Sequence, residues 1–108
     1  MRILCITSAL MMTAAPVFAT TDIIEEASYQ QHLTFICYMF GTAVTLEDWE
    51  KTTADHDKVA QDAINDGAAI AYTEAMRHAG ITRAEATMER WKSQSDAEDA
   101  CGGILQRQ

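Results

Sequence analysis

Proline is almost missing from this sequence, because the single proline among 108 residues is Pro16. Proline is the strongest helix breaker, so no residue of that kind interrupts the chain after position 16. Alternating apolar and polar residues, which favour strands, are also scarce, whereas alanine and glutamate are frequent. The composition therefore predicts an all-α protein.

Basic residues are few. The chain has 8 lysines and arginines against 16 aspartates and glutamates, a formal charge of −8. Nucleic-acid backbones and anionic lipid surfaces attract proteins through basic patches, so this balance argues against either as a partner. An acidic surface suits a basic protein partner, although it is also an ordinary means of staying soluble.

Long apolar runs are missing as well. The apolar segment Ile3 to Met12 is shorter than the roughly 20 residues that a transmembrane helix needs. It follows Arg2 and precedes Pro16 and the triplet Val17-Phe18-Ala19, which together are typical of an export signal. We expect cleavage before Thr20 and no membrane insertion. A membrane anchor is the alternative.

This interpretation divides the chain into a signal peptide, 1–19, and a helical domain, 20–108. Cleavage removes Arg2 and no acidic residue, so the domain keeps 7 basic and 16 acidic residues, a formal charge of −9. The expected location is periplasmic or secreted.

Motifs for catalysis and for cofactors are lacking. The sequence has no G-x-S-x-G, no C-x-x-C, no glycine-rich phosphate loop and no two histidines at i, i+4 spacing. We therefore predict a protein that is not an enzyme and needs no cofactor. Glu74 and His78 are spaced to share a metal, but a salt bridge is the simpler interpretation. Asp55-His56-Asp57 could likewise ligate a metal or cap a helix, and we expect no metal site.

Two cysteines, Cys37 and Cys101, remain after the predicted cleavage. An even pair in an oxidising compartment predicts a disulfide, here closing a loop of about 64 residues and contributing about 2–5 kcal/mol. Two free redox-active thiols are the alternative.

Helix signals predict a single-domain bundle of four to five helices stapled by this disulfide. Apolar residues at three- and four-residue steps predict a helix over about 22–43, and Thr45 with Asp48 predicts the start of the next. We expect a break in the polar segment 52–57, then a helix from Lys58 to Gly80.

Two further capping boxes, Thr82 to Glu85 and Ser95 to Glu98, predict the starts of the last helices. A row of small residues would let helices approach closely; its members are Ala63, Gly67, Ala68, Ala71 and Ala75.

Three carboxylates are candidates for partner binding. Asp55, Asp62 and Asp66 recur at helical spacing, and the last two repel each other at i, i+4. This face either meets a basic partner or is an ordinary solvated surface. The first predicted helix is apolar nearly all round from Leu33 to Phe40, so it is either central or in contact with a partner.

The order of these features resembles the periplasmic immunity proteins that neutralise type VI secretion amidase effectors. The matching segments are Tyr29 to Cys37, Lys58 to Ala63, Ala71 to Glu74, and Cys101 with Ile104-Leu105. They span most of the domain, although the stretch between Cys37 and Asp62 is longer than that family's pattern.

The resemblance implies a helical inhibitor that plugs the cleft of a basic cell-wall amidase effector. A small periplasmic chaperone and an accessory subunit of an envelope complex are the alternatives, and a homodimer is possible in each case.

Export is directly testable. We expect N-terminal sequencing of the exported protein to begin at Thr20, because signal peptidase prefers small residues such as Val17 and Ala19 at the −3 and −1 sites. An intact Met1 on soluble cytoplasmic protein would contradict the prediction.

Overall fold

Four helices make up most of the chain that the structure describes, which is residues 23–107. The computed structural model has a first helix over residues 23–39, α2 over Leu46–Asn65, α3 over Ile70–Glu89 and α4 over Gln94–Arg107. No strand occurs within residues 23–107, so the predicted all-α bundle is confirmed, with four helices. The predicted signal peptide and its cleavage site lie outside the described residues.

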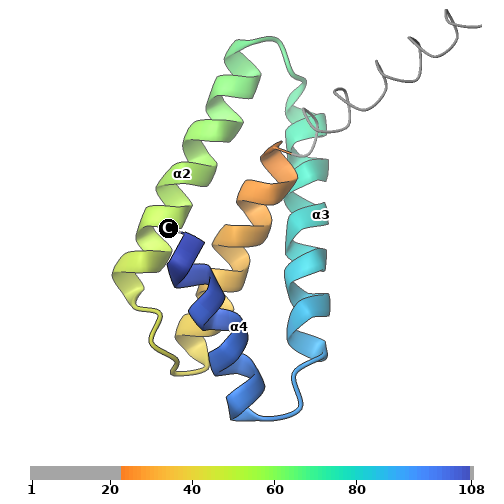
Figure 1. The fold of residues 1–108 in the computed structure, drawn as a ribbon. Coiled ribbons are helices and arrows are strands. Elements are labelled where there is room, and N and C mark those ends of the chain that lie inside the picture. The colour runs from red at the N-terminus through yellow and green to blue at the C-terminus, as the bar shows by residue number, and fades with distance from the viewer. Residues whose placement is uncertain (1–22, 108) are drawn as a thin grey trace, which may run out of the picture.

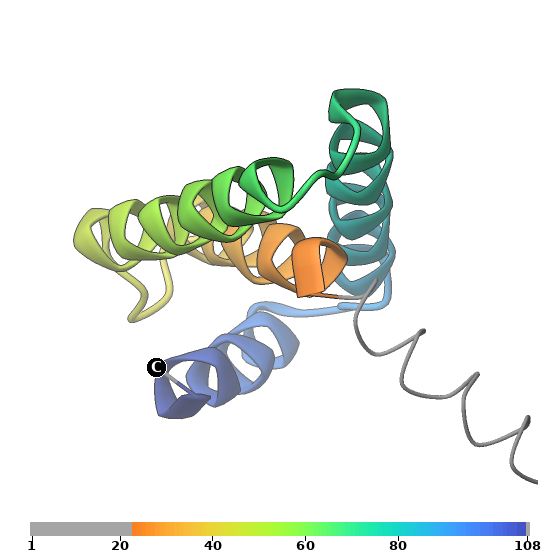
Figure 2. The same cartoon turned by 90° about the horizontal axis from the view of Figure 1, so that it is seen from above.

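The first helix is the centre of the bundle, and successive helices run in opposite directions (Figure 1). Seen from above, α2, α3 and α4 lie around it (Figure 2). It meets α2 through a hydrogen bond from Gln31 to Thr53 and α3 through one between Tyr29 and Thr87. The disulfide joins it to α4. The helix is therefore central from Leu33 to Cys37, whereas the apolar side chains of residues 38–40 stay 38–65% exposed.

The core surrounds the predicted disulfide, which the structure confirms. Cys37 and Cys101 are bonded, with their Cα atoms 5.8 Å apart. The largest buried side chains beside them are Leu33 and Ile104, at 2% and 0% exposure. Partly buried side chains pack against this cluster from the first helix, from α3 and from the turn before α4; they are Tyr29, Met88 and Trp91.

Glycine ends the first helix and α2 in the same way. Gly41 and Gly67 have φ angles of +72° and +106°, which favour glycine because it lacks a Cβ. After α2, the Gly67 and Ala68 amides donate to the carbonyls of Ile64 and Ala63, the two bonds of a Schellman motif. The first helix therefore stops at residue 39, short of the predicted 43.

The predicted break at 52–57 is wrong, because α2 is continuous from Leu46 to Asn65. The Thr52 hydroxyl donates to the carbonyls of Asp48 and Trp49, at 3.3 and 2.9 Å, so it bonds within the helix rather than capping a new one. The start at Thr45 is confirmed, since Thr45 and Asp48 form a complete capping box.

The predicted helix from Lys58 to Gly80 is also wrong. The chain turns after Asn65, and α3 runs without interruption through Gly80 and past Thr82, whose predicted capping box is not used. The small-residue row is consequently divided: Ala63 lies on α2, Gly67 and Ala68 lie in the turn, and Ala71 and Ala75 are exposed on α3.

Gly80 instead marks the closest approach of α3 to the first helix. A Cβ at this position would lie 2.5 Å from the Glu25 carbonyl oxygen and 2.6 Å from the Ser28 Cβ. The Ser28 hydroxyl donates to the Arg77 carbonyl at 2.7 Å across the same contact. Space, rather than helix termination, therefore requires glycine at position 80.

Arg83 fastens the same two helices at their surface. It donates to Glu25 at 3.1 Å and to Glu26 at 3.3 Å, and its guanidinium carbon lies 4.3 Å from the centre of the Tyr29 ring. Partial burial lowers the pKa of Arg83, but the hydrogen bonds and charges of the two glutamates raise it above the ordinary arginine value.

The last helix begins slightly before the predicted Ser95. The Ser93 hydroxyl accepts from the Asp96 amide at 3.2 Å, and the Asp96 carboxylate accepts from the Lys92 amide at 2.8 Å. The cap is the same kind of serine–acid pair, placed two residues earlier in the chain.

The close approach at Gly80 predicts a steep cost for a methyl group. Gly80→Ala should lower the free energy of unfolding by about 1–3 kcal/mol, because backbone atoms of the first helix must move. Gly102→Ala is the matched control, since nothing lies within 4 Å of its added Cβ, and it should stabilise α4 by about 0.5–1 kcal/mol. Urea unfolding of both variants measures the difference. Equal changes of the same sign would contradict the close packing.

Candidate partner-binding groove

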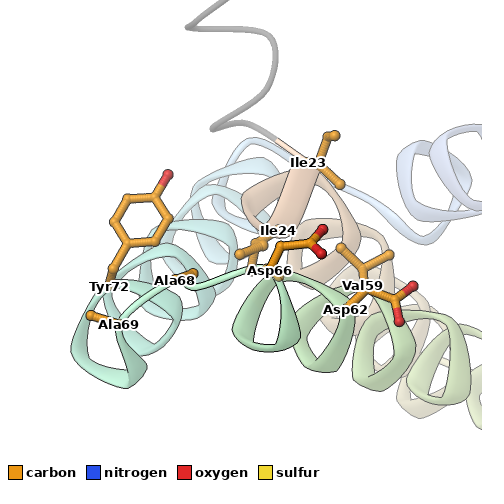
Figure 3. A pocket seen from close by; sticks show the side chains of 9 residues that line it. Ile23, Ile24, Val59, Asp62, Asp66, Ala68, Ala69 and Tyr72 are labelled. Atoms are coloured by element: carbon orange, nitrogen blue, oxygen red, sulfur yellow. The ribbon is translucent and has the colours of Figure 1, made fainter.

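An open groove lies at the end of the bundle away from the disulfide, where the first helix begins, α2 ends and α3 begins (Figure 3). Its volume is about 590 Å³. It is lined by Ile23 and Ile24 of the first helix, Val59, Asp62, Ala63 and Asp66 of α2 and its cap, Ala68 and Ala69 of the turn, and Tyr72 of α3.

The groove exists because the core lies elsewhere. In α2 the buried residues are Thr52 and His56, and in α3 they are Thr73, Gly80 and Ala84, so neither helix contributes a large buried apolar side chain. Apolar side chains at this end stay partly open instead; Ile23, Ile70 and Tyr72 are 52%, 68% and 36% exposed. Exposed apolar surface of this kind, edged by polar groups, is typical of an interaction site.

Two of the three predicted partner-binding carboxylates, Asp62 and Asp66, line this groove, and their neutralisation differs. Asp62 accepts a hydrogen bond from Lys58 at 2.7 Å. That hydrogen bond and the charge of Asp62 raise the pKa of Lys58 above its ordinary value. Lys58 therefore offsets the charge of Asp62, and the predicted repulsion between Asp62 and Asp66 is weakened.

Asp66 has no such partner among the side chains that the structure describes. It is the C-cap of α2, where the free carbonyls already carry partial negative charge, and the last turn of α2 contains no basic residue. A negative side chain at this position is unfavourable for the helix. The groove edge is therefore a place where a cation would be stabilised.

Asp55 does not belong to the groove. It is exposed on α2, about two turns before Asp62, and is not among the groove-lining residues. The structure thus brings together two of the three predicted carboxylates and leaves the third on the solvated surface of the same helix.

The predicted histidine pairings are not formed. Glu74 pairs with Arg77 at 3.0 Å, so the predicted partner His78 is not its contact. His56 lies mid-helix rather than in a capping segment; its Nδ1 is 3.4 Å from Asp57, and its Nε2 is buried without a hydrogen bond within the described residues. Within residues 23–107, no group of three or more histidine, cysteine or acidic side chains is placed to hold a metal ion.

The apolar lining was not predicted from the sequence. Val59 and Tyr72 were assigned to one continuous helix, on which they could not face each other across a groove. The Gly67 turn reverses the chain between α2 and α3, so Val59 and Tyr72 line the same groove from its two ends (Figure 3). In the sequence, the pair Asp66-Gly67 is typical of a helix C-terminus and indicates that a helix ends there.

A second apolar area lies at the opposite end, where the first helix ends and α2 begins. Met39 and Leu46 are 65% and 44% exposed, whereas Phe40 packs against Trp91 with ring centres 5.4 Å apart. None of these residues lines the groove. Acidic side chains lie near this area as well, since Glu47 and Asp48 are in the first turn of α2.

Comparisons of the chain with models of protein families, with curated protein sequences and with solved structures find no match. Among the helices within residues 23–107, none is both long and apolar enough to span a membrane.

The position of Asp66 predicts a stabilising substitution. Asp66→Asn should raise the free energy of unfolding by about 0.3–1 kcal/mol at low ionic strength, because it removes a negative charge from the C-terminus of α2. Asp55→Asn is the control, since it makes the same change in the middle of the same helix and should have a smaller effect. Urea unfolding at low and high salt measures both, and an equal gain in the two variants would contradict the dipole explanation.

Proposed function

We propose that this chain is an exported, non-catalytic binding protein that captures a basic protein partner at the groove between the first helix, α2 and α3. The observation that carries the proposal is the combination of an open apolar lining with two carboxylates at its edge. Apolar burial would supply most of the affinity, and the carboxylates would select a cationic segment and speed its approach.

The chain's overall charge supports the same partner. With 16 acidic and 8 basic residues, the protein attracts basic surfaces from a distance and repels acidic ones. The expected binding is therefore sensitive to salt mainly through the association rate, because screening shortens the range of this attraction.

The resemblance to immunity proteins supports a more specific form of the proposal. In this form the partner is a cell-wall amidase effector, and binding closes the effector's cleft and so protects the producing cell. If the chain is an immunity protein, we also expect the effector gene to lie next to its own gene, because an immunity protein is encoded beside its effector. A chaperone would instead bind many unfolded chains, and an envelope subunit would co-purify with a membrane complex.

The test uses the purified product of the neighbouring gene as the partner. The double substitution Asp62→Asn and Asp66→Asn should slow association on the order of tenfold at low salt and leave the fold intact. The control is the pair Glu47→Gln and Glu50→Gln, which makes the same charge change at the other end of α2, where both side chains are exposed. Surface plasmon resonance at two salt concentrations measures the rates.

Equal association rates for the wild type and the Asp62 and Asp66 variant would contradict capture at the groove. If the chain is an immunity protein, its co-expression with the exported effector should restore growth. Tight binding without restored growth would contradict the immunity function but not capture at the groove.

A further inference from the structure

We propose that Lys58 neutralises Asp62 in the free protein and that a cation of the partner takes its place in the complex. That cation is an arginine beside an apolar side chain, and it displaces Lys58 from Asp62 when it enters the groove. This inference rests on the proposed function and names the group that the groove would recognise.

The contact between Lys58 and Asp62 is suited to exchange. It lies entirely on the surface, with the side chains 76% and 58% exposed, and joins residues one turn apart on α2. Exposed ion pairs of this kind contribute little, so an incoming cation can replace one at small cost. Lys58 bonds Oδ2 of Asp62, while Oδ1 has no hydrogen bond among the described residues.

The groove edge is short of one positive charge. Asp62 and Asp66 stand one helical turn apart at the end of α2, the helix carbonyls add partial negative charge, and Lys58 is the one basic side chain that the structure pairs with them within residues 23–107. A cation that reaches both carboxylates therefore gains an interaction that Lys58 provides only to Asp62.

The apolar lining decides which cation this is. A bare metal ion would leave Ile23, Val59 and Tyr72 uncovered, whereas a long basic side chain lays its aliphatic stem on such a surface and keeps its charge at the edge. Arginine fits better than lysine, because its planar guanidinium presents several donors in fixed directions and can contact two carboxylates. An apolar neighbour of the arginine would occupy the rest of the groove.

The experiment uses hexylguanidinium as a probe, which has the cation and an apolar tail but no protein attached. Titration into the folded protein at low salt, followed by two-dimensional amide NMR, should shift the signals of Val59, Asp62, Asp66 and Tyr72 together. Two matched controls have one feature each: guanidinium lacks the tail and hexanoate lacks the positive charge. Neither should shift these signals at the same concentration and ionic strength.

Two variants separate displacement of Lys58 from a change of net charge. Lys58→Gln should bind hexylguanidinium about two- to fivefold more tightly, because the probe no longer competes with the lysine for Asp62. Lys51→Gln is the matched control, because it removes the same charge from an exposed position two turns earlier on α2. It should bind within about 1.5-fold of the wild type.

Equal tightening in the two lysine variants would overturn the inference, because net charge alone would then explain it. Equal shifts with hexanoate, or no shift of the groove signals with hexylguanidinium, would also overturn it. Each of these outcomes is distinct from failure of the proposed function, since the probe needs no protein partner. If the groove binds the probe but the partner ignores Asp62 and Asp66, the groove recognises a cation with an apolar neighbour, but both capture at the groove and displacement of Lys58 by that partner are contradicted.

Discussion

The bond between Cys37 and Cys101 decides which end of this bundle is closed and which is open. It holds α4, the shortest of the labelled helices, against the end of the first helix, where Leu33 and Ile104 are buried around the sulfur atoms. A helix of 14 residues covers only that end. Within residues 23–107, no fourth helix lies over the other end, where α2 passes into α3 (Figure 1). Its apolar side chains consequently form a groove rather than a core.

At the open end, the close contact between the first helix and α3 fixes one side of the groove. The absent side chain of Gly80 lets the two backbones approach, the Ser28 hydroxyl satisfies the Arg77 carbonyl, and Arg83 bridges to Glu25. Ile24 is the residue next to Glu25, so the same contacts that fix this helix pair also fix one side of the groove. Stability and the proposed binding site are thus built by neighbouring residues of one helix.

Charge at the groove follows from the direction of α2. A helix presents partial negative charge at its C-terminus, and this helix ends at the groove with Asp62 and Asp66 in its last turn and cap. At the other end of α2 the helix dipole is positive and the acidic side chains Glu47 and Asp48 offset it. At the groove, the helix dipole and the two aspartates have the same sign, so both favour a cationic partner.

The sequence by itself determined the features that depend on residue type or on neighbours along the chain. Two cysteines in the predicted domain leave one intramolecular pairing, and Thr45 with Asp48 forms its cap locally, so both were predicted correctly. Tertiary structure decided the roles of two glycines, because the sequence prediction placed Gly67 inside a helix and Gly80 at its end. Gly67 ends a helix through its positive φ, whereas Gly80 continues one because another backbone lies against it. The turn at Gly67 then places Tyr72 and Val59 in the lining of one groove, although no local pattern relates these two residues.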